Sequence, residues 1–147
     1  QVLAQLRAQL PMLRPRAADA TVFATPTDAA ANAALPDWQR RRWRGRYGDG
    51  VVDLAQQDAA ARVRIGSGLV CAAELRHVCR HEQVLHLDDL LLRRTRIGLT
   101  EPGAGEALLP GLRDLVCAEL GWDGSRWDAE HARYRALWSA QHALPSA

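Results

Sequence analysis

Large apolar residues recur every three or four positions along most of the chain after residue 36. In the clearest run, 106–120, five aliphatic side chains share one helical face: Leu108, Leu112, Leu115, Val116 and Leu120. A later stripe joins Trp127, His131, Tyr134 and Trp138. No segment alternates apolar and polar residues over a length that would build a sheet. The sequence therefore predicts an all-α fold, a small irregular bundle of about six helices.

Capping and turn-forming residues divide this pattern into helices. Gly48 and Gly121 suit the left-handed position that ends a helix, and Asp37 suits an N-cap. Ser125 followed by Asp128 is similar to a capping box. We expect helices at 37–47, 50–58, 70–85, from Asp88 or Asp89 to just before Gly98, at 106–120, and from Ser125 onward.

The first 34 residues have a different character. Val2, Leu3, Leu6 and Leu10 are spaced as in the last turns of a helix before Pro11. Residues 12–36 then carry three prolines, many alanines and little periodicity, which is typical of a linker. We therefore divide the chain into the end of a preceding domain with its linker, 1–34, and a helical domain, 35–147.

Charged residues interrupt two of the apolar faces. Glu82 falls within a stripe that consists of Cys71, Leu75, Val78 and Leu85, and Arg94 falls within one that consists of Leu87, Leu90 and Ile97. Because a lone buried charge is costly, the sequence predicts a buried Glu82–Arg94 ion pair between the two helices. The alternative is that both side chains extend into solvent. Asp89 and Arg93, four residues apart, are expected to pair on the outer side.

Glu74, His77 and His81 lie along one flank of the helix expected at 70–85. Glu-x-x-His on a bundle helix is half of a di-iron site, but the second Glu-x-x-His is missing and Asp128 with His131 is the nearest substitute. The histidine pair also lacks the intervening glutamate and the third ligand of a zinc site. We favour partly exposed histidines at the edge of a packed face, and no metal site is predicted.

Residues 38–47 combine five arginines with three aromatic residues, Trp38, Trp43 and Tyr47. Such a helix can bind nucleic acid or an anionic membrane through phosphate contacts or interfacial insertion. A solvated basic face with tryptophans packed inward is favoured, because the net charge of the chain is only +2. A stand-alone interaction or nucleic-acid-binding module is the alternative function, and we expect no nucleic-acid partner.

Composition limits the chemistry and the location of the chain. All 19 basic residues are arginine. The odd number of cysteines, without Cys-x-x-Cys spacing, indicates reduced thiols in the cytoplasm: Cys71, Cys79 and Cys117. No stretch reaches the ~20 uncharged residues of a transmembrane helix. Neither a glycine-rich phosphate loop nor a Ser-His-Asp pattern is present, so no catalytic or cofactor-binding residue is predicted.

Residues 73–123 carry a pattern that resembles a known family. It consists of Ala-Glu-Leu at 73–75, His-Glu at 81–82, Asp-Asp-Leu-Leu-Leu-Arg-Arg-Thr-Arg-Ile-Gly-Leu at 88–99, and Glu-Leu-Gly-Trp-Asp at 119–123. With Tyr47-Gly48, Glu130 and Tyr134, it is similar to the C-terminal domain of aerobic FAD-dependent glycerol-3-phosphate dehydrogenases over about 35–137. Leu92 departs from the family, which often has tryptophan there.

The resemblance implies a parent enzyme that oxidises sn-glycerol 3-phosphate to dihydroxyacetone phosphate on FAD. Such an enzyme passes electrons to quinone at the inner face of the cell membrane. Its FAD-binding and substrate-binding residues belong to the preceding domain, so none maps onto this chain. The helical domain is then expected to be inactive alone and to pack on the FAD-binding domain, with a homodimer as a further option.

Overall fold

The computed structural model describes residues 35–142 and four earlier positions, 5, 9, 10 and 12. The expected helix end and linker fall almost entirely outside the described residues, so the boundary at residue 34 stays a prediction. Within 35–142 the chain forms six α-helices, α2 to α7, and one isolated antiparallel bridge, Arg64 with Cys71. The all-α class is confirmed.

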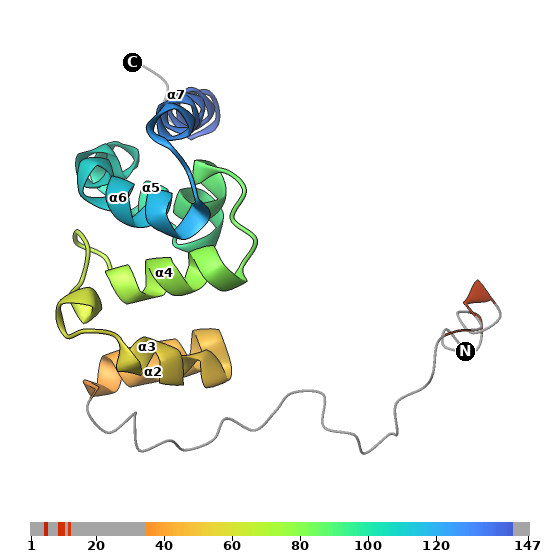
Figure 1. The fold of residues 1–147 in the computed structure, drawn as a ribbon, viewed down its shortest axis with the longest axis vertical. Coiled ribbons are helices and arrows are strands. Elements are labelled where there is room, and N and C mark those ends of the chain that lie inside the picture. The colour runs from red at the N-terminus through yellow and green to blue at the C-terminus, as the bar shows by residue number, and fades with distance from the viewer. Residues whose placement is uncertain (1–4, 6–8, 11, 13–34, 143–147) are drawn as a thin grey trace.

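The helices are stacked in layers (Figure 1). α2 (Asp37–Tyr47) and α3 (Val51–Gln56) form one end, α4 (Ala72–His81) lies next to them, α5 (Ile97–Thr100) and α6 (Leu109–Leu120) follow, and α7 (Gly124–Gln141) covers the other end. Tighter or wider turns join them: the 3₁₀ helices η2 (Gly48–Gly50), η3 (Ala60–Arg62) and η5 (Pro102–Leu108), and the π-helix η4 (Asp89–Arg94).

α4 connects two apolar cores. Leu75 and Val78, which have no exposed surface, pack into the larger core between α4, α6 and α7. Ala73 packs into the smaller core around Trp43 of α2. Full burial of a large aliphatic side chain stabilises the fold by roughly 1.5–3 kcal/mol. α4 is therefore the element on which both layers depend.

Glycine signals placed two helix ends correctly. α2 ends at Gly48 with φ +54°, and α6 ends at Gly121 in the left-handed conformation with φ +66°. The N-terminal caps were less well predicted. Asp37 is the first helical residue rather than the N-cap, and its carboxylate pairs with Arg40.

The capping box expected at the start of the last helix is wrong. α7 is capped by Asp123, whose carboxylate accepts hydrogen bonds from the Arg126 backbone N–H and the Ser125 hydroxyl, both at 2.7 Å. Asp128 is exposed. The cap therefore lies two residues before the serine that the pattern favoured.

The helix expected at 70–85 is shorter at both ends. α4 ends at His81, Gln83 adopts a left-handed backbone with φ +50°, and Leu85 is 69% exposed. Glu82 therefore follows the helix instead of lying on its apolar face. The predicted apolar stripe required one more helical turn after His81, and the helix ends before that turn.

The helix expected from Asp88 or Asp89 to Gly98 is also different. The chain forms one wide π turn, in which the Thr95 N–H donates to the Leu90 carbonyl at 2.9 Å, five residues back. The Thr95 hydroxyl donates to the same carbonyl at 2.6 Å. Arg96 then takes a left-handed conformation before the short α5 begins. Sequence periodicity contains no signal for this break.

Candidate functional site

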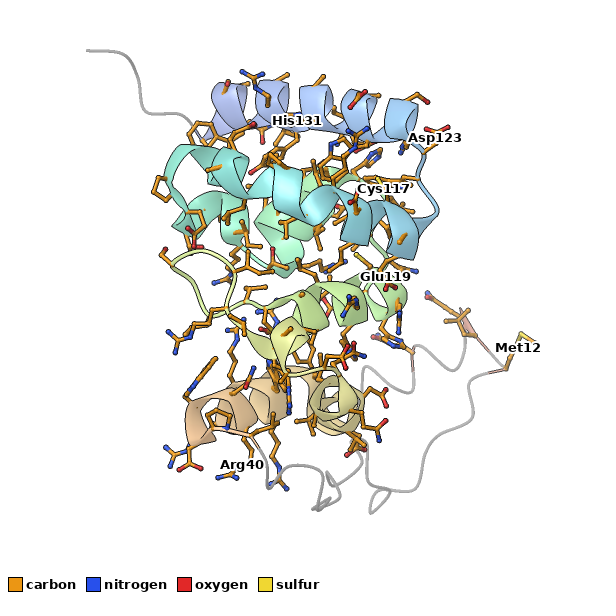
Figure 2. All side chains as sticks on the ribbon, turned by 60° about the vertical axis from the view of Figure 1, so that its left-hand side comes forward. Met12, Arg40, Cys117, Glu119, Asp123 and His131 are labelled. Carbon is orange, nitrogen blue, oxygen red and sulfur yellow. The ribbon has the colours of Figure 1, made fainter. Side chains whose placement is uncertain are left out.

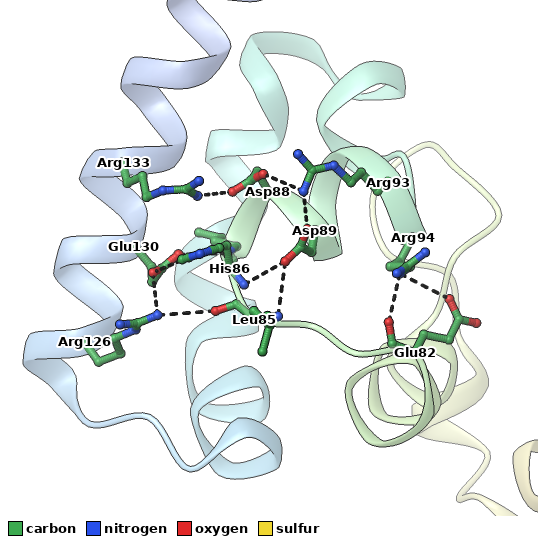
Figure 3. A network of polar contacts seen from close by, with 11 residues as sticks. Glu82, Leu85, His86, Asp88, Asp89, Arg93, Arg94, Arg126, Glu130 and Arg133 are labelled. Atoms are coloured by element: carbon green, nitrogen blue, oxygen red, sulfur yellow. Dashed lines mark hydrogen bonds and ion pairs between the residues drawn. The ribbon is translucent and has the colours of Figure 1, made fainter.

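The segment 85–98 is joined to α7 by two buried carboxylates (Figure 3). The first is Asp88, whose side chain has no exposed surface. It pairs with Arg133 of α7 and with Arg93, whose Nη1 lies 3.0 Å from Oδ2. Both guanidiniums are about half exposed. A buried carboxylate needs such partners to offset its loss of hydration, so Asp88 ties η4 to α7.

The second buried carboxylate is Glu130, only 4% exposed. It accepts the Leu87 backbone N–H at 3.0 Å and lies 2.9 Å from Nδ1 of His86 and 2.8 Å from Nη2 of Arg126. Burial raises the pKa of Glu130, but the hydrogen bonds from His86 and Leu87 outweigh it and hold the pKa below its usual value. We call Asp88, Glu130 and their partners the α7 clamp.

Asp89 supports the clamp from the same segment. Its Oδ2 accepts the backbone N–H groups of Leu85 at 3.2 Å and His86 at 3.0 Å, and its other oxygen pairs with Arg93. Desolvation raises the pKa of Asp89, but these hydrogen bonds lower it further than burial raises it. The contact expected between Asp89 and Arg93 is present, with Arg93 58% exposed.

Glu82 and Arg94 are in contact, but they are not buried. The Arg94 Nε donates to the backbone carbonyl of Glu82 at 3.0 Å and lies 3.9 Å from its carboxylate Oε2 (Figure 3). The side chain of Glu82 is 29% exposed and that of Arg94 is 39% exposed. The expected burial is wrong because α4 stops at His81. An exposed pair of this kind contributes about 0–1 kcal/mol.

Glu74 is fully buried and does not point to a metal site. Its Oε1 accepts hydrogen bonds from Nε of Arg42 at 3.2 Å and from the Tyr47 hydroxyl at 3.0 Å, which links α4 to α2. Burial and the neighbouring Glu74 carboxylate raise the pKa of Tyr47. The His77 ring meets the Tyr47 ring edge-on and the His81 ring at a tilt. Burial and the adjacent His81 lower the pKa of His77.

No group of three or more His, Cys, Asp or Glu side chains within the described part of the chain is placed to hold a metal ion. Glu74 is engaged with α2, and His131 pairs with Glu106 at 2.8 Å. The structure therefore does not bring together the two half-sites that the sequence suggested for comparison.

The arginine-rich α2 packs its aromatic residues inward, as the favoured interpretation expected. Trp43 has no exposed surface, and the guanidinium of Arg64 lies 4.2 Å from the ring centre of Trp38. Arg42 is engaged with Glu74. The outer arginines of this helix thus form a solvated face above a packed one.

The three cysteines are free thiols. Cys71 and Cys79 are buried, and desolvation raises their pKa to about 11 and about 12. Cys117 is partly exposed. The thiols of the two buried cysteines are therefore protonated and unreactive at neutral pH.

A groove of about 290 Å³ lies between α2, the turn at 65–70 and α5. We call it the arginine groove, since three guanidiniums line it together with apolar side chains: Arg42, Arg46, Arg96, Ile65, Leu69, Val70 and Ile97. Glu101 is also in its wall, where it accepts the Ser67 and Gly68 N–H groups at 2.9 and 2.8 Å.

A comparison with known protein families identifies the family of this chain. Residues 18–127, well over half of the sequence, match the family model described as the C-terminal domain of alpha-glycerophosphate oxidase. This chain belongs to that family.

Curated relatives of this alpha-glycerophosphate oxidase C-terminal domain are dehydrogenases. It is 32% identical to the glycerol-3-phosphate dehydrogenase of Mycobacterium leprae over 117 residues, which are 76% of this chain and 20% of that protein. It is 30% identical to glycerol-3-phosphate dehydrogenase 2 of Mycobacterium tuberculosis over 112 residues, or 73% of this chain and 19% of the relative. The chain thus spans about a fifth of the length of these relatives. No solved structure matches it.

Gly98 and Tyr134 of the family-like pattern are buried inside this C-terminal domain. The Tyr134 hydroxyl donates to the Ala104 carbonyl at 2.7 Å, and Trp138 Nε1 donates to the Gly98 carbonyl at 3.0 Å. A Cβ at Gly98 would overlap the Tyr134 hydroxyl. Glycine is therefore required where α5 approaches α7.

Sequence reasoning missed the α7 clamp of this domain. Asp88 and Arg133 are 45 residues apart, and His86 and Glu130 are 44 apart. A weak signal was present, because Arg126, Glu130 and Arg133 lie at i, i+4 and i+7 on one helical face. Nothing in the sequence indicated which segment that face would meet.

Proposed function

We propose that this chain is the C-terminal accessory domain of an FAD-dependent glycerol-3-phosphate dehydrogenase. The parent enzyme oxidises sn-glycerol 3-phosphate to dihydroxyacetone phosphate and passes electrons to quinone. The domain itself carries out no chemistry. The observation that carries this proposal is the family match over 18–127, together with mycobacterial relatives whose names state this substrate.

The residues of this chain do not fit FAD. Dinucleotides are bound by a glycine-rich turn between a strand and a helix. The three Gly-x-Gly pairs here, at 48–50, 66–68 and 103–105, lack the third glycine, and no strand precedes them within residues 35–142. Flavin binding and substrate oxidation are therefore assigned to the rest of the parent protein.

The role left for the domain is packing on the FAD-binding domain. The family is defined by its C-terminal position, and the relatives are about five times longer than this chain. Peripheral attachment of the parent at the inner face of the cell membrane is part of the proposal, and a homodimer is compatible with it. No helix within the described residues is long and apolar enough to cross a membrane.

The experiment is to purify the complete product of the gene and, separately, this 147-residue chain. The complete protein should show flavin absorbance and should reduce an artificial electron acceptor when glycerol 3-phosphate is added. The isolated chain should be colourless and inactive. Stoichiometric flavin on the isolated chain, or a complete protein that neither binds flavin nor turns over glycerol 3-phosphate, would refute the assignment.

The alternative, a nucleic-acid-binding module, is tested with the same samples. Binding through the arginines of α2 would depend steeply on salt, because each phosphate contact releases counterions. We expect no salt-dependent retention of the isolated chain on DNA or RNA. Tight binding that weakens as the salt concentration rises would favour the alternative.

A further inference from the structure

The arginine groove combines an apolar floor with two exposed guanidiniums. Val70 and Ile97 are 6% and 2% exposed and form the apolar floor, whereas Leu69 is 44% exposed. Arg46 and Arg96 are exposed and take part in no ion pair among the described residues, although the Arg46 guanidinium carbon lies 5.6 Å from the centre of the Tyr47 ring. The groove thus offers both apolar surface and positive charge that no carboxylate among these residues neutralises.

The backbone of Arg96 is in an unfavourable conformation. It has φ +62° and ψ +15°, a left-handed geometry that is unfavourable for a residue with a Cβ. Glycine would avoid this cost. Strained residues concentrate where a side chain has a task beyond folding. The Arg96 side chain lines the groove and has no ion-pair partner within the part of the chain that the structure describes.

Carboxylates are the best-matched partners for such a groove. A guanidinium binds a carboxylate through two parallel hydrogen bonds, and arginine is enriched at protein interfaces. The one acidic residue that lines the groove, Glu101, is occupied by the turn at 67–68, and the lining Arg42 is engaged by the buried Glu74. The apolar floor suits a peptide segment rather than a free inorganic anion.

The segment is sought in the rest of the parent. The family is described as a C-terminal domain and the relatives are about five times longer than this chain, so a region that precedes the domain is tethered to it ahead of α2. A tethered segment binds at high effective concentration, so a few ion pairs are enough to hold it.

We propose that the arginine groove is the docking site for an acidic, partly apolar segment of the FAD-binding region that precedes this domain in the parent. This inference rests on the proposed function and names the surface that the domain uses. The contact would orient the helical domain on the parent through Arg46 and Arg96.

The absence of lysine from the chain makes a sharp test available. Arg46→Lys or Arg96→Lys in the complete protein introduces the only lysine within these 147 residues. A zero-length carbodiimide reagent then couples that amine to a carboxylate in direct contact, and mass spectrometry identifies both residues. Arg41→Lys is the matched control, because Arg41 is exposed on the same helix and does not line the groove.

We expect amide cross-links from positions 46 and 96 to Asp or Glu residues outside the 147-residue chain, and none from position 41. Cross-links only to Glu101, no cross-links, or equal cross-linking of the control would overturn the proposal. Arginine-specific modification of the unsubstituted proteins gives a second measurement. Arg46 and Arg96 should react several-fold more slowly in the complete protein than in the isolated chain, whereas Arg41 should react equally in both.

Failure of this inference is distinguishable from failure of the proposed function. A complete protein that binds flavin and oxidises glycerol 3-phosphate, yet gives no cross-link from the groove, keeps the function and removes the docking site. Cross-links from the groove in a protein without flavin would keep the docking site and remove the function.

Discussion

The α7 clamp and the Glu82–Arg94 contact are two charged clusters on either side of the same segment, and they are built in opposite ways (Figure 3). In the clamp, Asp88 and Glu130 are almost completely buried and each has at least two charged or polar partners. In the other cluster, both side chains are substantially exposed, and the shortest contact is to a backbone carbonyl.

From this difference we expect that the burial and the number of partners, rather than the pairing of opposite charges alone, decide how much a cluster contributes to the free energy of unfolding. Removing one member of a buried network leaves the others without compensation for their lost hydration. Removing one member of an exposed pair lets the other return to water. The larger contributions to stability should therefore come from the clamp contacts, which the sequence pattern did not indicate.

Glu130→Ala should have the largest effect and test the clamp most directly. It strands the buried Leu87 N–H and removes the partner of His86 and Arg126, so we expect a loss of about 3 kcal/mol of unfolding free energy. Urea unfolding followed by circular dichroism measures it. Glu130→Gln is the matched control, since it keeps an acceptor for Leu87 and should lose less. A loss below 1 kcal/mol for the alanine variant would contradict the clamp.

Asp88→Ala should follow, at about 2 kcal/mol. The smaller value reflects its partners, Arg93 and Arg133, which are 58% and 42% exposed and can regain water. The same unfolding measurement applies. Asp128→Ala, an exposed aspartate on α7, serves as the control and should change the stability little. If Asp88→Ala and Asp128→Ala lowered the unfolding free energy equally, the burial of Asp88 would not be the reason for its contribution.

The pH dependence of stability sharpens the comparison further. The pKa values of Glu130 and Asp89 are lower in the folded chain than their ordinary values of 4.5 and 3.8. Between the folded and unfolded pKa values, the unfolded chain binds more protons, so the stabilisation is complete above about pH 5 and is lost as the pH falls through the folded values. Unfolding midpoints from pH 7 to 3 should show this decline. Glu130→Gln should make the decline shallower, and an unchanged slope would contradict the assignment.

The smallest effect is expected for Glu82 and Arg94. A double-mutant cycle with Glu82→Ala and Arg94→Ala should give a coupling energy below about 1 kcal/mol. Their exposed fractions and the 3.9 Å separation are the reason. A coupling of several kcal/mol would mean that the pair is buried after all and would remove the contrast with the clamp.

The fold class and the helix ends that depend on local residues could be predicted from the sequence. Contacts between segments that are far apart in the chain could not. Gly48 and Gly121 follow the last residues of their helices as expected, because both have a positive φ, which glycine adopts without a Cβ clash. The end of α4 at His81 was not predicted, because Glu82 and Leu85 continue the helical spacing of the sequence. The partners of Glu130 lie across the bundle, and helical periodicity carries no information about such pairings.

The contact between Glu82 and Arg94 was predicted, and its environment was not. The two residues are only 12 positions apart, so a turn between them is enough to bring them together. Their burial depends on where α4 ends and on the π turn, and neither is visible in the pattern. The structural or interface role assigned to Glu82, Arg94, Asp89 and Arg93 stays a prediction that the variants above address.

The π turn at 89–94 also has a consequence for the alignment of related sequences. A π-helix holds one more residue in its turn than an α-helix does, which is the mark left by a single-residue insertion. Deleting one residue there would convert the wide turn into an α-helical turn and leave Thr95, Arg96 and Gly98 in register with α7. A homologous chain with an α-helical turn at this point should therefore align with a one-residue gap between Asp89 and Gly98.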